Sequence, residues 1–385
     1  MSGTVAACPE PSVGVYVHVP FCASRCGYCD FAAVAGRDGE ISSYLEAIEA
    51  EIDVFQGEAP GEADTIFVGG GTPSRLAPRE VKRLLSAVRN RFAVARGAEV
   101  TVEGNPESLT AERLAGLAEA GVTRVCVGVQ SLDDTVLRRA GRPHDGPGAV
   151  QALRRARRGG FESVAADLIC GLPGEDLPRF GETVRRVVDE GPDHVSVYLL
   201  ETDKDTPLAR EVRSGRGGPQ DDEALVSAYE AAADVLEGAG LGLYEISNFA
   251  RPGHESRHNL KYWRDEPYAG FGLGAHAYLL GARRANEIDL DRYLERVSAG
   301  LDPVVWQEPF DGARRAAEAV ILGLRLREGV DLAAIERRYG VSLREGRLDA
   351  WERAEEAGVV EREGERARLT PGGRLRSNEL FAELI

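Results

Sequence analysis

One repeated pattern in the first 200 residues limits the fold more than any other feature of the sequence. A short apolar, β-branched run is followed each time by a longer stretch of helical period. Strands that alternate with helices in this way form βα units and a parallel sheet. Six units are too few for a closed eight-stranded barrel, so a partial barrel or a doubly wound sheet is expected. The six runs are residues 13–19, 65–68, 99–103, 124–129, 164–169 and 194–199.

The stretches of helical period between these runs are residues 41–55, 78–92, 110–120, 148–158 and 177–190. Beyond them the sequence predicts a helix over 221–237 and a strand over 243–246. The last part of the chain is charged, and helices are expected there over 313–326, 332–339 and 344–357. A hairpin at 359–369 and a final helix follow. Helices followed by a short hairpin are typical of a winged-helix-like module.

Composition and charge exclude several classes of protein. The chain has 385 residues, of which 43% are hydrophobic, so it can bury a large core and is not disordered. The net charge of -16 argues against nucleic acid as a partner, because a phosphate backbone requires a basic surface. No apolar run approaches the roughly 20 residues of a transmembrane helix, and the N-terminus lacks a secretory signal. A cytoplasmic protein without a transmembrane segment is expected.

The carboxyl ends of the predicted strands carry an unusual set of side chains. Parallel α/β folds bind ligands at these ends. The sequence places Cys22, a triple glycine at 69–71, Glu103, Gln130 and Asp167 there. A sheet with a purely structural role has no need for this set. We therefore expect a binding site at one rim of the sheet.

Three cysteines follow the first predicted strand. Cys22, Cys26 and Cys29 have the spacing C-x3-C-x2-C. Three thiolates on one loop can hold three irons of a [4Fe–4S] cube and leave the fourth iron open to a small molecule. The amino and carboxylate groups of S-adenosylmethionine would fill that place. A zinc site is the alternative, and it would need His18 or Asp30 as its fourth ligand.

Four segments resemble a known family. They read Tyr-Val-His-Val-Pro-Phe-Cys at 16–22, Gly-Gly-Gly-Thr-Pro-Ser at 69–74, Gly-Val-Gln-Ser at 128–131 and Asp-Leu-Ile-Cys-Gly-Leu-Pro at 167–173. The cysteine spacing resembles the radical S-adenosylmethionine superfamily, and the four segments resemble its coproporphyrinogen-oxidase-like branch. With the C-terminal part, the resemblance covers nearly the whole chain. It implies an α/β fold, a partial (β/α)6 TIM-type barrel with a mostly helical C-terminal module that carries a β-hairpin.

The resemblance also implies roles for single residues. Cys22, Cys26 and Cys29 would bind the [4Fe–4S] cluster. Carboxylates accept hydrogen bonds from ammonium and hydroxyl groups, and arginine pairs with carboxylates, as S-adenosylmethionine requires. The residues implied for the S-adenosylmethionine site are Tyr16, Gly70, Gly71, Thr72, Glu103, Gln130, Arg142 and Asp167.

Two functions compete within this branch: oxygen-independent coproporphyrinogen III oxidase, which acts in porphyrin biosynthesis, and the HemW-type heme chaperone. The oxidase has a fourth cysteine two residues after the third ligand, where this chain has Phe31, and a longer segment before the cluster. The segment His-Asn-Leu-Lys-Tyr-Trp at 258–263 resembles the H-N-x-x-Y-W motif of the heme chaperones. Tyr-Glu-Ile-Ser-Asn-Phe at 244–249 also resembles that group. The sequence therefore favours a chaperone that binds heme and passes it to acceptor proteins.

Within the motif, His258 is the leading candidate for the axial ligand of heme iron, with Tyr262 and Trp263 placed to flank the porphyrin. Glu201 and His276 are further candidates for the pocket without an assigned role. The partners implied are heme and heme-acceptor proteins, with respiratory, membrane-associated proteins as candidates, and a homodimer is plausible. We predict three parts: a radical S-adenosylmethionine barrel over 1–240, a connecting segment with the heme motif over 241–306, and a winged-helix-like module over 307–385.

Overall fold

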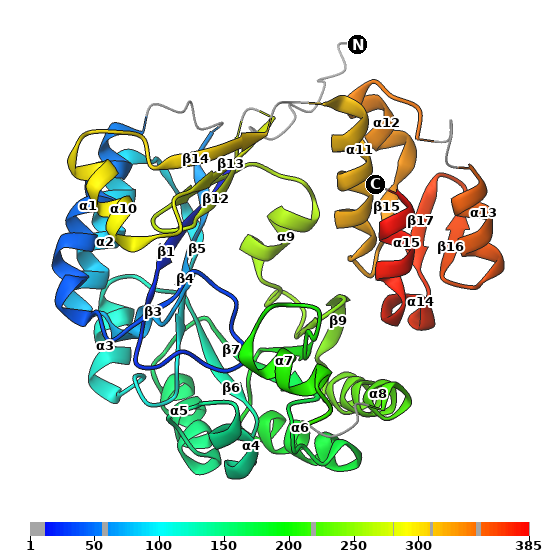
Figure 1. Ribbon diagram of the computed structural model, residues 1–385, viewed down its shortest axis with the longest axis horizontal. Helices are drawn as coiled ribbons and strands as arrows, with labels where there is room; N and C mark the ends of the chain where they lie inside the picture. Colours follow the sequence, from blue (N-terminus) through cyan, green and yellow to red (C-terminus); the bar gives the residue numbers. More distant parts are fainter. Residues whose placement is uncertain are drawn as a thin grey trace, which may run out of the picture.

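The computed structural model describes residues 12–55, 61–216, 221–279, 281–308, 311–343 and 348–384. Cys8 and residues 344–347 of one predicted helix lie outside these ranges. The main body is a twelve-stranded sheet, and the six predicted strands form its continuous parallel centre (Figure 1). These strands, in their order across the sheet, are β1 (Val13–Val19), β4 (Ala63–Gly70), β5 (Val94–Gly104), β6 (Arg124–Gln130), β7 (Ser163–Cys170) and β8 (His194–Leu199). The prediction of a partial (β/α)6 barrel is confirmed.

Helices alternate with these strands along the chain, and most of them cover the outer face of the sheet. They are α1 (Ile41–Val54), α2 (Pro78–Arg91), α3 (Ala111–Glu119), α4 (Asp134–Arg139), α5 (Gly146–Arg158), α6 (Phe180–Val188), α7 (Pro207–Arg213) and α8 (Asp222–Gly238). Short 3-10 helices precede three of them: η1 (Asp38–Glu40), η2 (Pro73–Arg75) and η3 (Leu177–Arg179). The stretch predicted as one helix over 177–190 therefore divides into η3 and α6.

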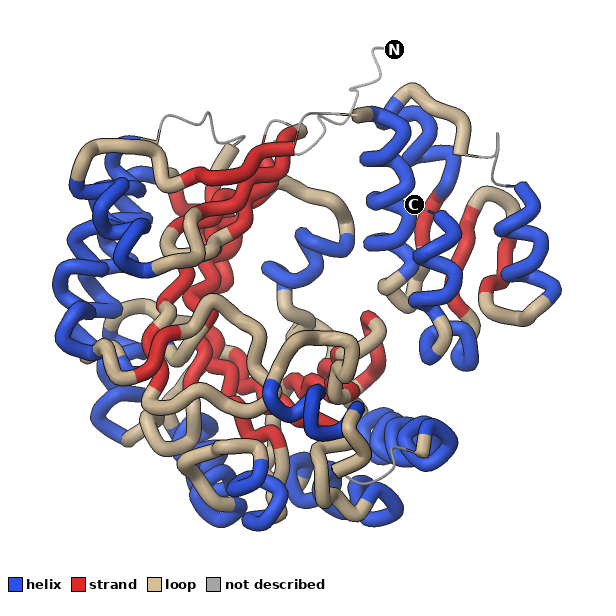
Figure 2. The backbone as a smooth tube through the Cα atoms, viewed as in Figure 1, coloured by secondary structure: helices blue, strands red, loops and turns tan. Residues whose placement is uncertain are grey.

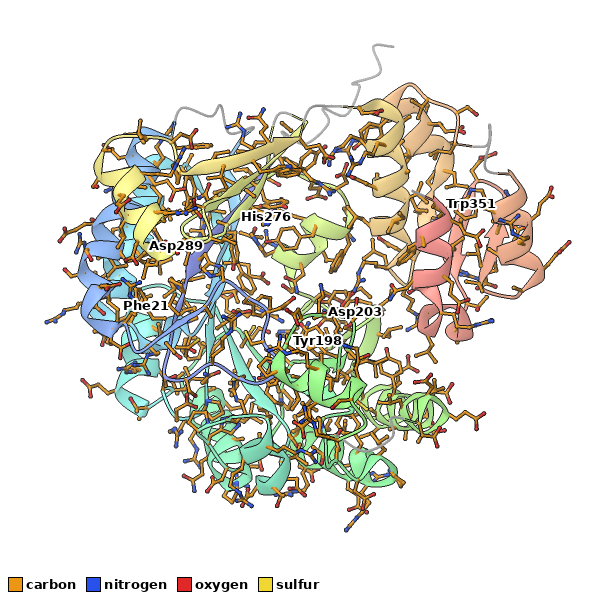
Figure 3. All side chains as sticks on the ribbon, viewed as in Figure 1. Phe21, Tyr198, Asp203, His276, Asp289 and Trp351 are labelled. Atoms are coloured by element: carbon orange, nitrogen blue, oxygen red, sulfur yellow. The ribbon has the colours of Figure 1, made fainter. Side chains whose placement is uncertain are left out.

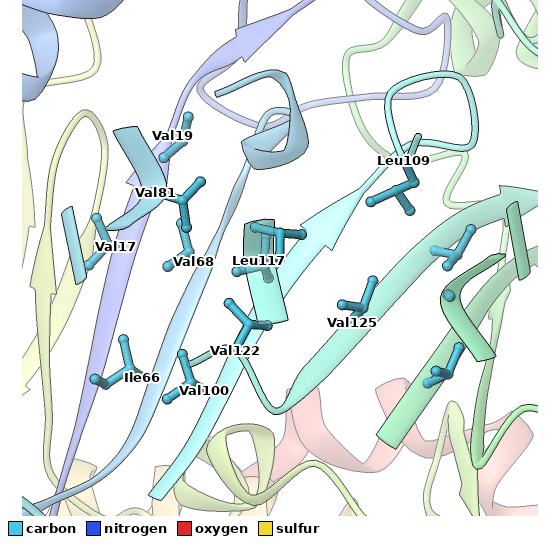
Figure 4. Close-up of a cluster of buried hydrophobic side chains, with 14 of the residues drawn as sticks. Val17, Val19, Ile66, Val68, Val81, Val100, Leu109, Leu117, Val122 and Val125 are labelled. Atoms are coloured by element: carbon cyan, nitrogen blue, oxygen red, sulfur yellow. The ribbon is translucent and has the colours of Figure 1, made fainter. Parts of the chain in front are cut away.

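The core lies between the strands and these helices. Alternate residues of the strands, such as Val17, Val68 and Val125, are fully buried there and pack with helix residues such as Val81 and Leu117 (Figure 4). Because successive side chains of a strand point to opposite faces, the residues between them face the inside of the barrel. This alternation turns the polar residues of the strands inward and leaves the outer face apolar.

Further strands extend both edges of the barrel sheet (Figure 2). Next to β1 lies a group that we call the strand extension: β11 (Tyr268–Phe271), β12 (His276–Leu279), β13 (Ala282–Asn286) and β14 (Val304–Glu308), with α10 (Leu290–Ser298) between the last two. Strand β11 is parallel to β1, and the other three are antiparallel to their neighbours. At the other edge, β10 (Asn248–Ala250) pairs with β8 and β9 (Gly242–Glu245) pairs with β10. Of these strands only β9 was predicted.

The C-terminal module comprises five helices and three short strands. They are α11 (Gly312–Leu324), β15 (Val330–Asp331), α12 (Leu332–Tyr339), α13 (Leu348–Glu356), β16 (Val360–Glu363), β17 (Arg366–Leu369), α14 (Pro371–Leu375) and α15 (Ser377–Leu384). The strands form a separate antiparallel sheet, and the predicted hairpin is β16–β17. The predicted boundary before residue 307 falls inside β14, which belongs to the large sheet.

Helix α11 bridges the two ends of the open sheet. Near its start, Arg314 forms an ion pair with Glu308 of β14 at 2.7 Å. Just after its end, Arg325 forms one with Glu245 of β9 at 3.3 Å. The module therefore closes the side that six parallel strands leave open. Within the described ranges, no helix is both long and apolar enough to cross a membrane.

Candidate functional site

The cysteine loop lies at the carboxyl end of β1. It is bracketed by two short paired strands, β2 (Phe21–Cys22) and β3 (Val34–Ala35). The loop is tied to the barrel by backbone hydrogen bonds, from Gly27 N to Ala140 O at 3.0 Å and from Leu208 N to Gly27 O at 2.8 Å. The sequence thus places this loop, as predicted, over the rim of the sheet.

The three thiols of the loop are half-buried. Cys22 Sγ lies 3.4 Å from Thr72 Oγ1. Burial, and then the neighbouring charges of Cys26 and Cys22, raise the pKa of Cys29 to about 11. Within the described residues, no three His, Cys, Asp or Glu side chains converge into a ready metal site.

The two candidates for a fourth zinc ligand are otherwise engaged. His18 is buried, with Nδ1 at 3.0 Å from Tyr16 Oη and Nε2 at 2.9 Å from Ala32 O. Asp30 is exposed and lies 3.7 Å from Lys204 Nζ. The ring of His18 is therefore not available to complete a tetrahedral zinc site, and Asp30 is turned to solvent beside Lys204, which favours a three-thiolate cluster.

The triple glycine forms a turn that no other residue could form. Gly70 has a φ of +107°, and a Cβ there would lie 2.5 Å from the His18 ring. A Cβ on Gly71 would lie 2.5 Å from the carbonyl oxygen of Pro20. The backbone therefore passes close under the cysteine loop and presents its own polar groups at the rim.

Two buried carboxyl groups face the barrel interior beside this turn. Glu103 Oε2 accepts a hydrogen bond from Gly70 N at 3.1 Å, and Asp167 Oδ1 accepts one from Ser196 Oγ at 2.7 Å. Burial, and then the charge of Asp167, raise the pKa of Glu103 to about 8. Burial also raises the pKa of Asp167. Two carboxyl groups that are short of cationic partners suit a ligand with an ammonium group and hydroxyl donors.

Arg142 is buried and joins the cysteine loop to the rim. Its Nη2 donates to Asn105 Oδ1 at 2.7 Å and to Gly128 O at 2.9 Å, and its Nη1 lies 3.4 Å from Cys26 Sγ. The Nε atom of Arg142 is buried without a partner. Gln130 stands beside this group with a φ of +66°, and its Oε1 is also buried without a partner. Unpartnered buried polar atoms beside a non-glycine residue with positive φ are typical of a ligand-binding site.

The structure therefore brings the residues predicted for the S-adenosylmethionine site to one rim. Tyr16 faces the barrel interior on β1, and Thr72 follows the glycine turn beneath Cys22. Sequence reasoning did not assign a role to Asn105, which donates to Thr72 Oγ1 at 3.1 Å while accepting from Arg142. Its position directly after the strand that carries Glu103 is the sequence signal that points to it.

The other predicted site residue, His258, lies apart from this rim. It belongs to α9 (Arg257–Trp263), which begins at Ser256, whose Oγ accepts from Asn259 N at 3.4 Å. His258 is fully buried, with Nδ1 at 2.8 Å from Thr65 Oγ1 and Nε2 at 2.8 Å from Tyr262 Oη. Burial lowers the pKa of His258 to about 3.

Other contacts of α9 close the end of the barrel where the strands begin. Lys261 Nζ lies 2.9 Å from Asp64 Oδ1, and His258 N donates to Glu99 Oε1 at 3.2 Å. The His258 ring stacks against Phe67 at 5.3 Å between centroids. We call His258, Lys261 and Tyr262 the barrel floor. In this structure the motif histidine is a packed and fully bonded part of that floor.

Two comparisons with known proteins bear on the family. Residues 16–187 match the family model of the radical SAM superfamily, and residues 311–376 match that of the HemN C-terminal domain. The chain is 39% identical to the heme chaperone HemW of Mycobacterium tuberculosis, over 99% of this chain and 97% of the relative. It is 34% identical to the heme chaperone HemW of Bacillus subtilis, over 96% of this chain and 98% of the relative.

The chain belongs to the HemW family. Among solved structures, coproporphyrinogen III oxidase (HemN) from Escherichia coli matches with a TM-score of 0.84. It covers 98% of this chain and 91% of that chain at 23% identity, which shows a shared fold. Membership of the radical SAM superfamily implies a [4Fe–4S] cluster and S-adenosylmethionine in general terms.

Proposed function

We propose that this protein is a heme chaperone, which binds heme and passes it to acceptor proteins. The observation that carries the proposal is its similarity, over nearly the whole length of both chains, to relatives named heme chaperone HemW. Phe31 supports it, because this residue stands where the oxidase has its fourth cysteine, and its side chain is 63% exposed.

We propose further that Cys22, Cys26 and Cys29 hold a [4Fe–4S] cluster, with Arg142 close enough to Cys26 to offset the charge of its thiolate. Such a cluster, when bound, supplies an open iron and an electron. S-adenosylmethionine would lie between this loop and the two inward carboxylates, with its amino N–H groups and ribose hydroxyls donating to Glu103 and Asp167. The proposed site comprises Tyr16, Gly70, Gly71, Thr72, Glu103, Gln130, Arg142 and Asp167.

The prediction that His258 binds heme iron stays a prediction. Both of its ring nitrogens are hydrogen-bonded, so direct ligation would break the bond to Thr65 or the bond to Tyr262. A place in the cytoplasm, a homodimer and respiratory, membrane-associated acceptors also stay predictions. So does the three-part division at 240 and 306.

Titration of hemin into the anaerobically reconstituted protein tests the proposal. A saturable shift of the Soret band from that of free hemin is expected, and an unchanged hemin spectrum would overturn the chaperone function. The oxidase alternative is tested on the same sample with S-adenosylmethionine, reductant and coproporphyrinogen. Turnover at roughly 1 per second, or even about a hundredfold slower, would favour the oxidase.

A further inference from the structure

His276 is an exposed histidine at the start of β12, outside the H-N-x-x-Y-W motif. Within the described ranges its ring has no hydrogen-bond or ion-pair partner. The rings of His18, His144, His194 and His258 all have partners, whereas the ring of His254, like that of His276, has none in the part of the chain that the structure describes. An imidazole that is exposed and unengaged is available to a metal without any rearrangement of the fold.

Strand register places His276 on the inner face of the sheet. Tyr16, which faces the barrel interior, is paired with Gly270 of β11. The antiparallel pair of Tyr268 with Tyr278 then sets Gly270 opposite His276. Residues paired across a sheet point to the same face, so His276 is on the face of Tyr16. Figure 3 shows His276 on the side of the strand extension that is turned towards α9.

The neighbours of His276 on this face are small on both sides. On β11 the neighbour is Gly270, where a Cβ would lie 1.9 Å from the carbonyl oxygen of His276, so this position accepts no side chain. On β13 the neighbour is Ala285. A glycine and an alanine beside an exposed imidazole place no bulky side chain next to it on the sheet, which leaves room for a planar ligand.

Two further residues of the same face suit a porphyrin with propionate groups. Trp306 of β14 is paired with Ala285 and is 45% exposed. It lies two strands from His276, about 10 Å by strand spacing, within reach of a porphyrin ring. Arg283, paired with Tyr278, holds a partly exposed ion pair with Glu318 at 3.2 Å and can turn to a carboxylate ligand.

We propose that His276 supplies the axial imidazole to heme on the inner face of the strand extension, with Trp306 against the porphyrin and Arg283 near a propionate. This inference rests on the proposed heme-binding function and names the site for it. His258 then keeps its place in the barrel floor. The heme site is open to solvent, as transfer to an acceptor requires, whereas the floor is closed.

Hemin titrations of the wild type, His276→Ala, His276→Met and His254→Ala test the proposal. His276→Ala should weaken binding by roughly 10- to 100-fold, as expected for the loss of one axial bond. His276→Met should restore binding with a displaced Soret band, because thioether replaces imidazole. His254→Ala is the matched control, since His254 also lies outside the motif and its ring also has no partner within the described residues, and it should bind like the wild type.

Added imidazole should restore the wild-type Soret position to His276→Gly, a result that a merely structural histidine would not give. Wild-type affinity and Soret position in His276→Ala would overturn the proposal while leaving the heme-chaperone function intact. Absence of specific hemin binding by the wild type would overturn both. Because His276 is exposed, these variants are expected to fold, and an unchanged thermal midpoint checks this.

Discussion

The guanidinium carbon of Arg325 lies 4.3 Å from the centre of the Trp263 ring, so the last residue of the heme motif is stacked against the C-terminal module. The same arginine is the ion-pair partner of Glu245, whose side chain is fully buried. The motif therefore joins two parts of the chain, with its histidine in the barrel floor and its tryptophan on the module. This double contact gives the motif a structural role that is independent of heme.

Arg325→Ala is expected to lower the free energy of unfolding by about 2–4 kcal/mol. It removes the stack on Trp263 and leaves the buried carboxylate of Glu245 without its cation. Urea denaturation measures the change. The double variant Arg325→Ala/Glu245→Gln should recover part of the loss, because the uncompensated charge is gone. A double variant no more stable than the single one would contradict this account.

His258→Ala is expected to destabilise the protein by about 2–5 kcal/mol. The change opens a cavity beside Phe67 and leaves the hydroxyl groups of Thr65 and Tyr262 without their hydrogen-bond partner. Chemical denaturation of the heme-free protein measures this change in the free energy of unfolding. If unfolding is unchanged and only heme binding is lost, His258 is a ligand and not a part of the floor.

Replacing Cys22, Cys26 and Cys29 together by Ala should abolish the iron content of anaerobically purified protein. The native protein should hold about four irons and absorb broadly near roughly 400 nm. Cys126→Ala/Cys170→Ala is the control, since both thiols are buried in strands away from the loop, and it should keep its iron. Native zinc, or iron retained by the triple variant, would show that the cluster assignment is wrong.

Affinity for S-adenosylmethionine should rise with pH up to about 8. Glu103 must be ionised to accept hydrogen bonds from the amino group, and its pKa is raised to about 8 by burial and then by Asp167. Below that pH each binding event must first release a proton, which changes affinity by about tenfold per pH unit. Calorimetric titrations between pH 6 and 9 measure the slope. Glu103→Gln should bind weakly without this rise, and an equal slope in that variant would point to another group.

The centre of the sheet could be predicted from the sequence because its strands are local, apolar and β-branched. The strand extension could not, since segments such as Ala282–Asn286 carry arginines and lack an apolar alternation. The barrel floor could not be predicted from the sequence for a different reason. Helix α9 has only seven residues, too few for a helical period, and His258 bonds to Thr65, which lies 193 residues earlier. When the distant residues that contact His258 are not known, the motif suggests a heme ligand more readily than a packed histidine.

Glu51 should make stability depend on pH. It is buried, accepts hydrogen bonds from Gly272 N at 2.9 Å and Tyr293 Oη at 2.6 Å, and has its pKa raised to about 7 by burial. Because the folded state keeps a proton on Glu51 that the unfolded state has lost, the contribution of Glu51 to stability is fully present below about pH 4.5 and is lost as pH rises through 7. The loss is on the order of 3 kcal/mol relative to Glu51→Gln. Denaturation of both proteins at pH 5 and pH 9 measures it, and parallel profiles would contradict it.

The floor and the bridging helix α11 both come from the last third of the chain. During synthesis the ribosome releases the cysteine loop and all six parallel strands before residues 257–263 and 312–324 emerge. Until then the nascent barrel is open at the end that the floor closes and along the side that α11 closes. Cofactors inserted at that stage would meet water on faces that the finished protein seals. Loading of the rim is therefore expected to follow completion of translation.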